Sequence, residues 1–220
     1  MALQSALLIA AGYLLGSIPT AYLAGRWLKG IDLRRYGSGT VSGSGIYEHV
    51  ARWAVVPVGL FDVGKAALPA WLGLRLGLGL PVAAAAGMAA AVGHNWPIFL
   101  HFQGGRGLGC FLGILAVIFP WGIPWLLGAL AIGWLLGDSA PWALASMALL
   151  PAFAHLSGGP DVMTPLAVAM VLVTLAKRLE ANRRPLPPAG PERRQVILRR
   201  LVFDRDIPSH RQWLRRKPLD

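Results

Sequence analysis

Residues 108–136 read LGCFLGILAVIFPWGIPWLLGALAIGWLL, a run of 29 residues without a single charged side chain. A helix that crosses the hydrocarbon core of a bilayer needs about 20 mostly apolar residues. Pro120 and Pro124 interrupt this run, and proline kinks or breaks a helix because it has no backbone N–H. One kinked helix or two short helices would fill this length, and of these we favour two short helices.

The composition of the whole chain agrees with that stretch. Apolar residues make up 55% of the 220 residues and charged residues only 14%, whereas a soluble domain has about 25% charged residues. The surplus apolar surface must face lipid, so the sequence predicts an all-α integral membrane protein. These numbers exclude a disordered chain, a collagen-like repeat and a disulfide-stapled secreted domain.

Apolar runs that could form the other spans were located by length and by their charged flanks. Together with the two short helices of 108–136 they predict about seven membrane helices, the others covering 3–28, 53–74, 81–94, 141–155 and 164–179. We expect residues 1–182 to form the transmembrane domain and residues 183–220 a basic tail.

Basic residues predict the orientation of the chain in the membrane. The net charge is +11; thirteen Lys or Arg lie in 177–217 and five in 26–52. Seven spans put the loop 29–52, the loop 95–107 and the tail on one side, which the positive-inside rule makes cytoplasmic, with the N-terminus outside. Residues 195–203 could form an amphipathic helix on lipid headgroups, and a solvated tail is an equal alternative. A nucleic-acid partner is not expected, because the chain offers no folded basic face.

The first cytoplasmic loop is rich in glycine and hydroxyl side chains. Nine residues, 37–45, read GSGTVSGSG. Such a loop turns freely and offers N–H and O–H donors to phosphate oxygens. The candidate ligand-binding residues here are Gly37, Ser38, Gly39, Thr40, Ser42 and Ser44. A flexible Gly/Ser linker is the alternative interpretation.

The second cytoplasmic loop has a Gly-Gly-Arg-Gly turn just before an apolar helix. Its glycines permit close approach, a guanidinium can chelate phosphate, and the N-terminus of the next helix adds its dipole. The candidate residues are His94, Asn95, Gly104, Gly105, Arg106 and Gly107. The alternative is an interfacial turn in which Arg106 reaches to lipid headgroups.

Inside the second span, Asp62 and Lys65 stand three residues apart, so their side chains can pair on one helix face. Ionisable residues within a span are functional candidates, but a structural ion pair is equally plausible. Gly12 and Gly16 have the GxxxG spacing that is typical of close helix packing. The sequence has no zinc-protease motif, no serine-hydrolase elbow, no His-x4-Asp acyltransferase signature and no cysteine pair, so we expect no metal and no cofactor.

Taken in order, these motifs resemble the bacterial acyl-phosphate-dependent glycerol-3-phosphate acyltransferase family over residues 14–192. The resemblance is carried by Gly16-Ser17-Ile18-Pro19, by Asp32 with Tyr36-Gly37-Ser38-Gly39, by Phe61-Asp62-x-x-Lys65 and by Gly93-His94-Asn95-Trp96-Pro97 before Gly104-Gly105-x-Gly107. The family has seven membrane helices and an outside N-terminus, which agrees with the orientation inferred above.

The resemblance implies a membrane enzyme that moves a fatty acyl group from acyl phosphate to glycerol 3-phosphate. The products would be lysophosphatidic acid and phosphate, in the first step of phospholipid synthesis. Ser38 and Arg106 would be catalytic, and the other residues named in the two loops would bind substrate. The protein would lie in the bacterial inner membrane with its active face cytoplasmic, in contact with lipid, and an enzyme that makes acyl phosphate is an expected partner.

The chain departs from the family pattern at several positions. The family carries asparagine where Thr40 and Gly45 stand and arginine where Glu48 stands, and Arg52, one turn further, is expected to supply that charge. Arg106 replaces a lysine. In the last motif the family's His-x-x-Asn becomes Leu179-x-x-Asn182, and Glu192 matches a later glutamate, so both Asn182 and Glu192 are expected at the site.

Other functions remain as alternatives. One is a diverged relative that uses a different phosphorylated substrate or has no activity. Another is a small membrane transporter, for which polar residues should spread along several spans to the middle of the membrane. Only Asp62 and Lys65 approach that pattern.

Overall fold

A computed structural model describes residues 1–214 of the chain, and within them the backbone is helical and contains no strand. The α-helices are α1 Ala2–Gly16, α2 Thr20–Lys29, α3 Gly43–His49, α4 Val55–Arg75, α5 Leu80–Asn95, α6 Leu108–Ile118, α7 Gly122–Leu135, α8 Ser139–Leu156, α9 Met163–Glu180, α10 Pro191–Phe203 and α11 His210–Leu214. Short 3-10 turns are η1 Leu33–Arg35, η2 Arg52–Ala54, η3 Ile98–Leu100 and η4 Ala181–Arg183.

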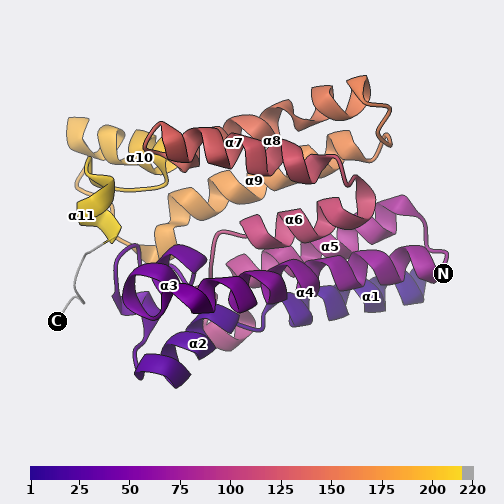
Figure 1. The fold of residues 1–220 in the computed structure, drawn as a ribbon, viewed down its shortest axis with the longest axis horizontal. Coiled ribbons are helices and arrows are strands. Elements are labelled where there is room, and N and C mark those ends of the chain that lie inside the picture. Colours follow the sequence, from indigo (N-terminus) through magenta and orange to yellow (C-terminus); the bar gives the residue numbers. More distant parts are fainter. Residues whose placement is uncertain (215–220) are drawn as a thin grey trace.

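The long helices form two groups that lie side by side. In Figure 1, α1, α4, α5 and α6 run roughly parallel to one another in the lower half, and α7, α8 and α9 form the upper half. One core of buried apolar residues joins the two groups, running from α5 through α6 to α8 and α9. The all-helical class expected from the sequence is confirmed.

Each predicted span corresponds to a helix or to a broken pair of helices. The run 108–136 forms two short helices, α6 and α7, and the break falls at Phe119–Trp121, where Pro120 cannot donate a backbone hydrogen bond. The predicted span 3–28 also contains a break, which was not expected: α1 ends at Gly16 and α2 begins at Thr20. Pro19 lies in this gap, and the residue before a proline is pushed out of helical geometry.

By length and apolar composition, three described helical segments are able to cross a membrane: Ala2–Lys29, Arg52–Arg75 and Ser139–Leu156. The helices α6 and α7 are apolar but shorter. At a rise of 1.5 Å per residue they reach about 17 and about 21 Å, against a hydrocarbon core of about 30 Å. Exposed large apolar side chains such as Leu60, Leu135 and Leu149 cover the outer faces of the helices, as lipid contact requires.

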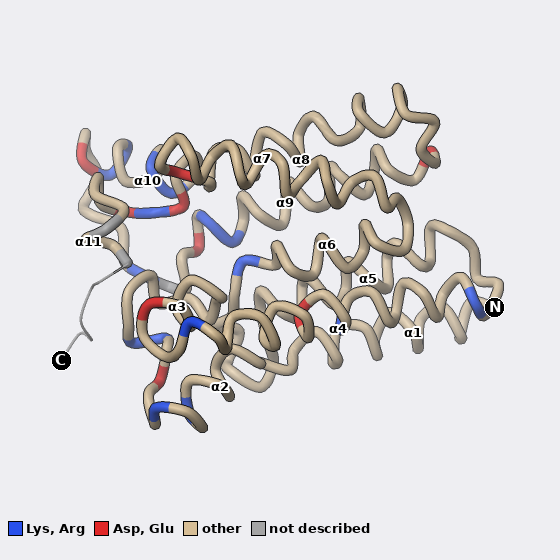
Figure 2. The backbone as a smooth tube through the Cα atoms, in the orientation of Figure 1, with Lys and Arg blue, Asp and Glu red and all other residues tan. Residues whose placement is uncertain are grey.

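Charged residues gather at one end of the molecule. Figure 2 shows that most Lys, Arg, Asp and Glu residues lie in the backbone around α2, α3, α10 and the adjacent ends of α6 and α9, while the N-terminus lies at the opposite end. The three segments expected to meet on one face, 29–52, 95–107 and the chain after Leu179, are in contact there through hydrogen bonds.

Small residues let α1 and α5 approach closely. A Cβ on Gly12 would lie 2.5 Å from the carbonyl oxygen of Ala86, and one on Gly16 would overlap the carbonyl oxygen of Ala90. Helix packing in membranes depends on such contacts, because lipid tails leave little hydrophobic drive between helices. The GxxxG spacing therefore serves packing, as expected.

Gly16→Ala should destabilise the fold. Overpacking of a tight helix contact costs about 1–3 kcal/mol, so we expect a clearly lower midpoint of thermal unfolding in detergent micelles. Gly128→Ala is the matched control, because a Cβ on this α7 glycine meets no atom within 4 Å. Equal midpoints for the two variants would contradict the packing role of Gly16.

Candidate active site

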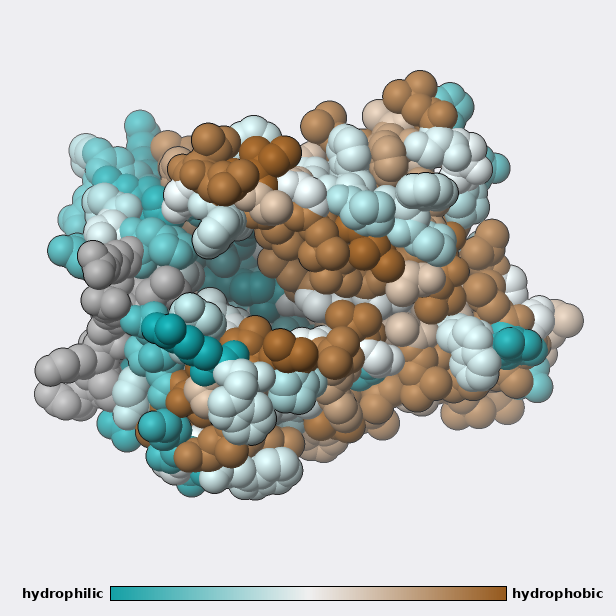
Figure 3. All heavy atoms as spheres, viewed as in Figure 1, coloured by the Kyte–Doolittle hydropathy of each residue, from teal (hydrophilic) through white to brown (hydrophobic). Residues whose placement is uncertain are grey.

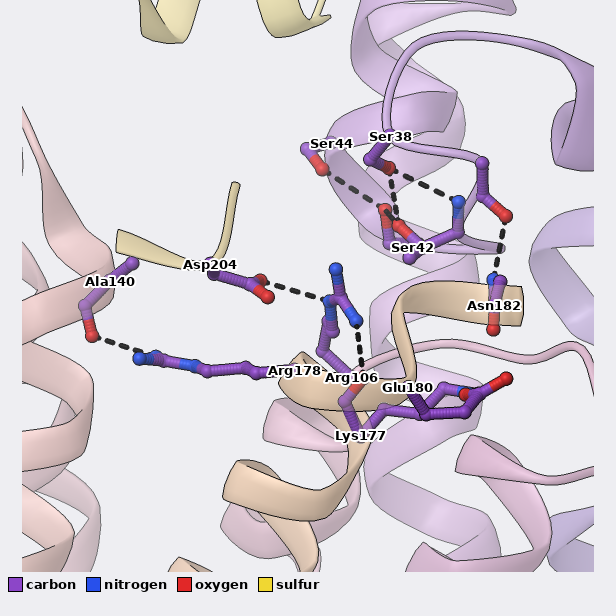
Figure 4. A network of polar contacts seen from close by, with 12 residues as sticks. Ser38, Ser42, Ser44, Arg106, Ala140, Lys177, Arg178, Glu180, Asn182 and Asp204 are labelled. Atoms are coloured by element: carbon purple, nitrogen blue, oxygen red, sulfur yellow. Dashed lines mark hydrogen bonds and ion pairs between the residues drawn. The ribbon is translucent and has the colours of Figure 1, made fainter. Parts of the chain in front are cut away.

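The glycine-rich first loop folds into a structured turn that lines up four hydroxyl groups. Ser38 Oγ lies 2.5 Å from Thr40 Oγ1, Thr40 Oγ1 donates to Ser42 Oγ at 3.2 Å, and Ser42 and Ser44 share a hydrogen bond of 3.0 Å. Ser38 and Thr40 are buried. Figure 4 shows these hydroxyls on one side of the loop, and Ser42 also caps the N-terminus of α3.

The start of this loop is fixed by an ion pair between Asp32 and Arg34, 2.6 Å apart. Asp32 Oδ1 also accepts the backbone N–H of Arg34 and so caps η1. Burial favours the neutral acid, but the hydrogen bonds from Arg34 and the charges of Arg34 and Arg26 outweigh it and lower the pKa of Asp32. The carboxylate is therefore charged at neutral pH, and its bonds to Arg34 fix the backbone at the start of the loop.

The second loop packs directly against the first. Val41 N–H donates to the carbonyl of Gly104 at 3.2 Å, and Gly105 N–H donates to the carbonyl of His94 at 3.0 Å. A Cβ on Gly105 would lie 2.7 Å from the Val41 carbonyl and would overlap the His94 ring, and one on Gly104 would meet Asn95 O at 2.7 Å. Gly105 is therefore required for the close approach of the two loops, and Gly104 for the close folding of the second loop onto the end of α5.

Asn182 joins the two loops. It lies just after α9 in the left-handed region, with φ of 52°, which asparagine tolerates better than most residues. Its Nδ2 donates to the carbonyl of Gly39 at 2.6 Å and to the carbonyl of Gly104 at 3.1 Å. The expectation that Asn182 belongs with the loop residues fits this geometry, and its role here is to cross-link the backbone.

Arg106 is held on two sides. Its Nη1 donates to the carbonyl of Lys177 at 3.1 Å, and its Nε lies 2.9 Å from Asp204 Oδ2. Figure 4 shows the guanidinium between these partners and pointing toward the hydroxyls of the first loop. A planar guanidinium with a free edge beside several O–H donors is suited to bind a phosphate group.

A cavity of about 470 Å³ connects these groups. Its polar wall is formed by Thr40, Ser42, Ser44, Asp62, His94, Arg106, Asp138 and Asp204. Apolar side chains from four helices, α4, α6, α7 and α8, also line the cavity, namely Val55, Val58, Leu108, Leu130, Trp134 and Ala143. In Figure 3 the surface is hollowed between the two halves of the molecule, with hydrophobic atoms on both sides of the hollow. The cavity can thus take a ligand with a charged head and an apolar chain.

The remaining predicted residues lie at varied distances from this cavity. Ser38 lies beside Arg106 in a small adjoining gap, while the carbonyls of Gly37 and Gly39 accept bonds from Arg184 and Asn182. Gly107, in the left-handed region, lines the cavity.

Three others contribute no lining to the cavity. Asn95 is fully buried below Gly107, without a hydrogen-bond partner for its amide among the described residues. Arg52 packs over the ring of Tyr47, 5.2 Å from its centroid. Glu192 is exposed in the first turn of α10.

Sequence reasoning missed three charged residues at the cavity, Arg178, Asp138 and Asp204. Arg178 is 4% exposed and donates to the carbonyls of Ala140 at 2.8 Å and Leu201 at 2.7 Å. A basic residue at the end of an apolar run is ordinarily a flank at the membrane surface, so its sequence context gave no signal. Asp204 could have been noticed as an acid within a basic tail.

Asp62 and Lys65 pair as the spacing predicts, at 2.8 Å. Lys65 Nζ also donates to the carbonyl of Ile18 at 3.0 Å, and Thr20 Oγ1 donates to Asp62 Oδ1 at 2.7 Å. The pair therefore ties α4 to both sides of the break between α1 and α2. His94 Nδ1 lies 3.4 Å from the same carboxylate oxygen, so the network also orients the His94 ring at the cavity wall. These contacts favour the structural role over direct chemistry.

Lys65→Met should lower the unfolding midpoint strongly, because it removes the ammonium that accompanies a buried carboxylate. Breaking a buried ion pair by removing one partner costs about 3–5 kcal/mol. The double variant Asp62→Asn with Lys65→Met should regain part of the loss, since it leaves no charge behind. Thermal unfolding in micelles measures both. A double variant less stable than Lys65→Met alone would argue against this explanation.

Comparison with known proteins agrees with the geometry. A family model described as glycerol-3-phosphate acyltransferase matches residues 6–185. Glycerol-3-phosphate acyltransferase 5 of Dehalococcoides mccartyi is 35% identical over 98% of this chain and 95% of its own length, and a glycerol-3-phosphate acyltransferase of Synechococcus sp. is 38% identical over 80% and 88%.

Among solved structures, the chain is similar to the crystal structure of PlsY (YgiH), an integral membrane glycerol 3-phosphate acyltransferase, in its glycerol 3-phosphate form. The TM-score is 0.73 and the sequence identity 26%, over 82% of this chain and 91% of that chain. The fold is thus shared with a protein whose structure was solved in a glycerol 3-phosphate form. The chain belongs to the glycerol-3-phosphate acyltransferase family.

Proposed function

We propose that this protein is a membrane enzyme that transfers a fatty acyl group from acyl phosphate to glycerol 3-phosphate. The observation that carries the proposal is the placement of Arg106. Its guanidinium faces the hydroxyls of the first loop at a cavity that apolar side chains of α4, α6, α7 and α8 also line. A phosphate head and an acyl chain need that combination. Family membership supports the same substrates.

The reaction joins two ligands that both carry phosphate. A hydroxyl oxygen of glycerol 3-phosphate attacks the acyl carbonyl carbon, the bond from that carbon to the phosphate oxygen breaks, and the phosphate leaves with the electron pair. Arg106 would stabilise the charge that grows on the leaving phosphate, and Ser38 with Thr40 would donate to its oxygens or to the attacked carbonyl oxygen. The acyl chain would lie along Val58, Leu108 and Leu130, which are apolar and line the cavity.

A substrate phosphate oxygen is the proposed acceptor of the hydroxyl proton. His94 is the only histidine of the predicted set, but its Nδ1 faces Asp62 and its Nε2 lies against Gly105. Neither ring nitrogen is therefore presented to the cavity as a free base. No metal is needed in this scheme, because the arginine and the hydroxyls supply the electrostatic stabilisation.

We further propose that seven spans cross the membrane, formed by α1 with α2 and by α4 to α9, with the N-terminus outside and the active face cytoplasmic. The crowding of charge at the end with α2, α3 and α10 supports this orientation through the positive-inside rule. A bacterial inner membrane is the expected location, with lipid around 1–182 and the basic segment 183–220 inside the cell. An acyl-phosphate-producing enzyme remains the expected partner.

The concentration of polar side chains at one end favours an enzyme over a transporter. Along the spans, the ionisable side chains away from that end are few, and Asp62 and Lys65 are occupied with each other and with the helix break. An alternating-access site would need such groups near the middle of several helices.

Purified protein in lipid, given palmitoyl phosphate, should release phosphate only when glycerol 3-phosphate is present, and lysophosphatidic acid should appear in step. Arg106→Ala should lower kcat/KM by about 100-fold or more, the scale typical of removing one key donor to developing charge. Arg106→Lys, which restores the residue of the family pattern, should lose much less. Release independent of the acceptor, or wild-type turnover in Arg106→Ala, would contradict the proposal.

A further inference from the structure

The chain after Arg184 folds back over the cavity. Helix α10 packs on α8 and α9 and buries Val196 and Arg200. Arg200 donates to the carbonyls of Leu179 at 3.1 Å and Arg184 at 3.2 Å, and Arg178 donates to the carbonyls of Leu201 and Val202. The buried guanidinium of α9 donates to carbonyls of α10, and that of α10 donates back to a carbonyl of α9, so the two helices are held together from both sides. The segment is therefore docked as a part of the fold.

Beyond α10 the chain turns sharply and presents three alternating charges. Asp204 is in the left-handed region with φ of 56°. Asp204 pairs with Arg106, Arg205 pairs with Asp138 before α8, and Asp206 lies 3.8 Å from Arg184. Each of these contacts reaches a different segment around the cavity. The turn thus fastens the segment after α10 to the second loop, to the start of α8 and to Arg184 beyond α9.

Side chains of the same segment complete the cavity wall. Phe203, Asp204, His210 and Trp213 all line the cavity, and Trp213 is 7% exposed. The family match ends at residue 185, and the similar PlsY structure covers 82% of this chain. These wall residues therefore lie beyond the part of the chain that the family model matches, within the 98% of the chain that the Dehalococcoides mccartyi relative covers.

We infer that Asp204 is a positioning residue for Arg106, and that residues 191–213 complete the substrate cavity. This inference rests on the acyltransferase function proposed above. The ligand it fits is the phosphate of the acyl phosphate, the leaving group in the proposed reaction, which Arg106 would bind with the edge of its guanidinium that faces the hydroxyls of the first loop.

The geometry favours positioning over competition with phosphate. An arginine side chain has several rotatable bonds, and its freedom must be lost when it binds a ligand. Asp204 holds Nε and the Lys177 carbonyl holds Nη1, so the plane of the guanidinium is fixed before substrate arrives. Nη2 has no partner assigned among the described residues and lies on the side of the loop hydroxyls. A phosphate can bind there without displacing Asp204.

Asp204→Asn tests the inference, because it keeps the shape and removes the charge. We expect the KM for palmitoyl phosphate to rise about tenfold, the scale of one charge-assisted contact between the guanidinium and phosphate, with kcat changed less. Asp204→Glu should stay within about threefold of the wild-type KM, since the carboxylate can still reach Nε. Asp206→Asn is the matched control: it removes the same charge two residues away, and its KM should change less than about twofold.

The same substitution made in the Arg106→Lys variant tests whether Asp204 acts through Arg106. Lysine has no Nε, so adding Asp204→Asn to Arg106→Lys should not raise the KM further. If the KM of the double variant rises by the product of the two single-variant increases, the inference is overturned. An unchanged KM in Asp204→Asn would also overturn it, and a lower KM would show that Asp204 competes with phosphate instead.

Thermal unfolding of each variant separates positioning from folding. The hydrogen bonds of Arg178 and Arg200 hold α10 without Asp204, so the unfolding midpoint of Asp204→Asn should match that of Asp206→Asn. A selective drop in the Asp204→Asn midpoint, in proportion to the loss of affinity, would replace the inference with a purely structural role. Wild-type protein without acceptor-dependent transfer would refute the proposed function, whereas active wild type with an unaffected Asp204→Asn refutes this inference alone.

Discussion

The site depends on one side chain that holds together backbone segments far apart in the sequence. The amide of Asn182 donates to carbonyls of both loops, at Gly39 and at Gly104. Neither loop has regular structure of its own at these residues, so the cross-link fixes where the hydroxyls of one loop stand relative to Arg106 of the other. The membrane helices supply a rigid frame, but this amide sets the spacing on which phosphate recognition depends.

A membrane enzyme of this kind must also keep its charges compatible with lipid. In this structure, acidic side chains pair with neighbouring basic side chains. Asp62 with Lys65 ties down the break between α1 and α2, and Asp204, Arg205 and Asp206 pair around the cavity mouth. Asp204 holds one side of the Arg106 guanidinium, and its other edge is directed at the ligand space. The end of α10 and the segment after it add further lining to that space.

Much of this architecture could be predicted from the sequence. Apolar run lengths located the helices, and the prolines located the break between α6 and α7; the glycine and arginine motifs identified both loops. Two features could not be predicted. In the sequence, Arg178 resembles an ordinary basic residue at the end of a membrane helix. The docking of α10 depends on hydrogen bonds from arginine side chains to backbone carbonyls, and the spacing of residues in the sequence does not predict such bonds. Arg52 and Glu192 were expected at the site by motif position alone, and each lies away from the cavity wall.

The most direct test of this account is the KM for glycerol 3-phosphate in two variants of Asn182, measured beside their unfolding midpoints. Asn182→Ala removes the cross-link, whereas Asn182→Asp places a carboxylate against two carbonyl oxygens. We expect a higher KM in both variants, a larger increase for Asn182→Asp, and little change in the unfolding of the membrane helices. A wild-type KM in Asn182→Asp would contradict the claim that this amide sets the geometry of the site.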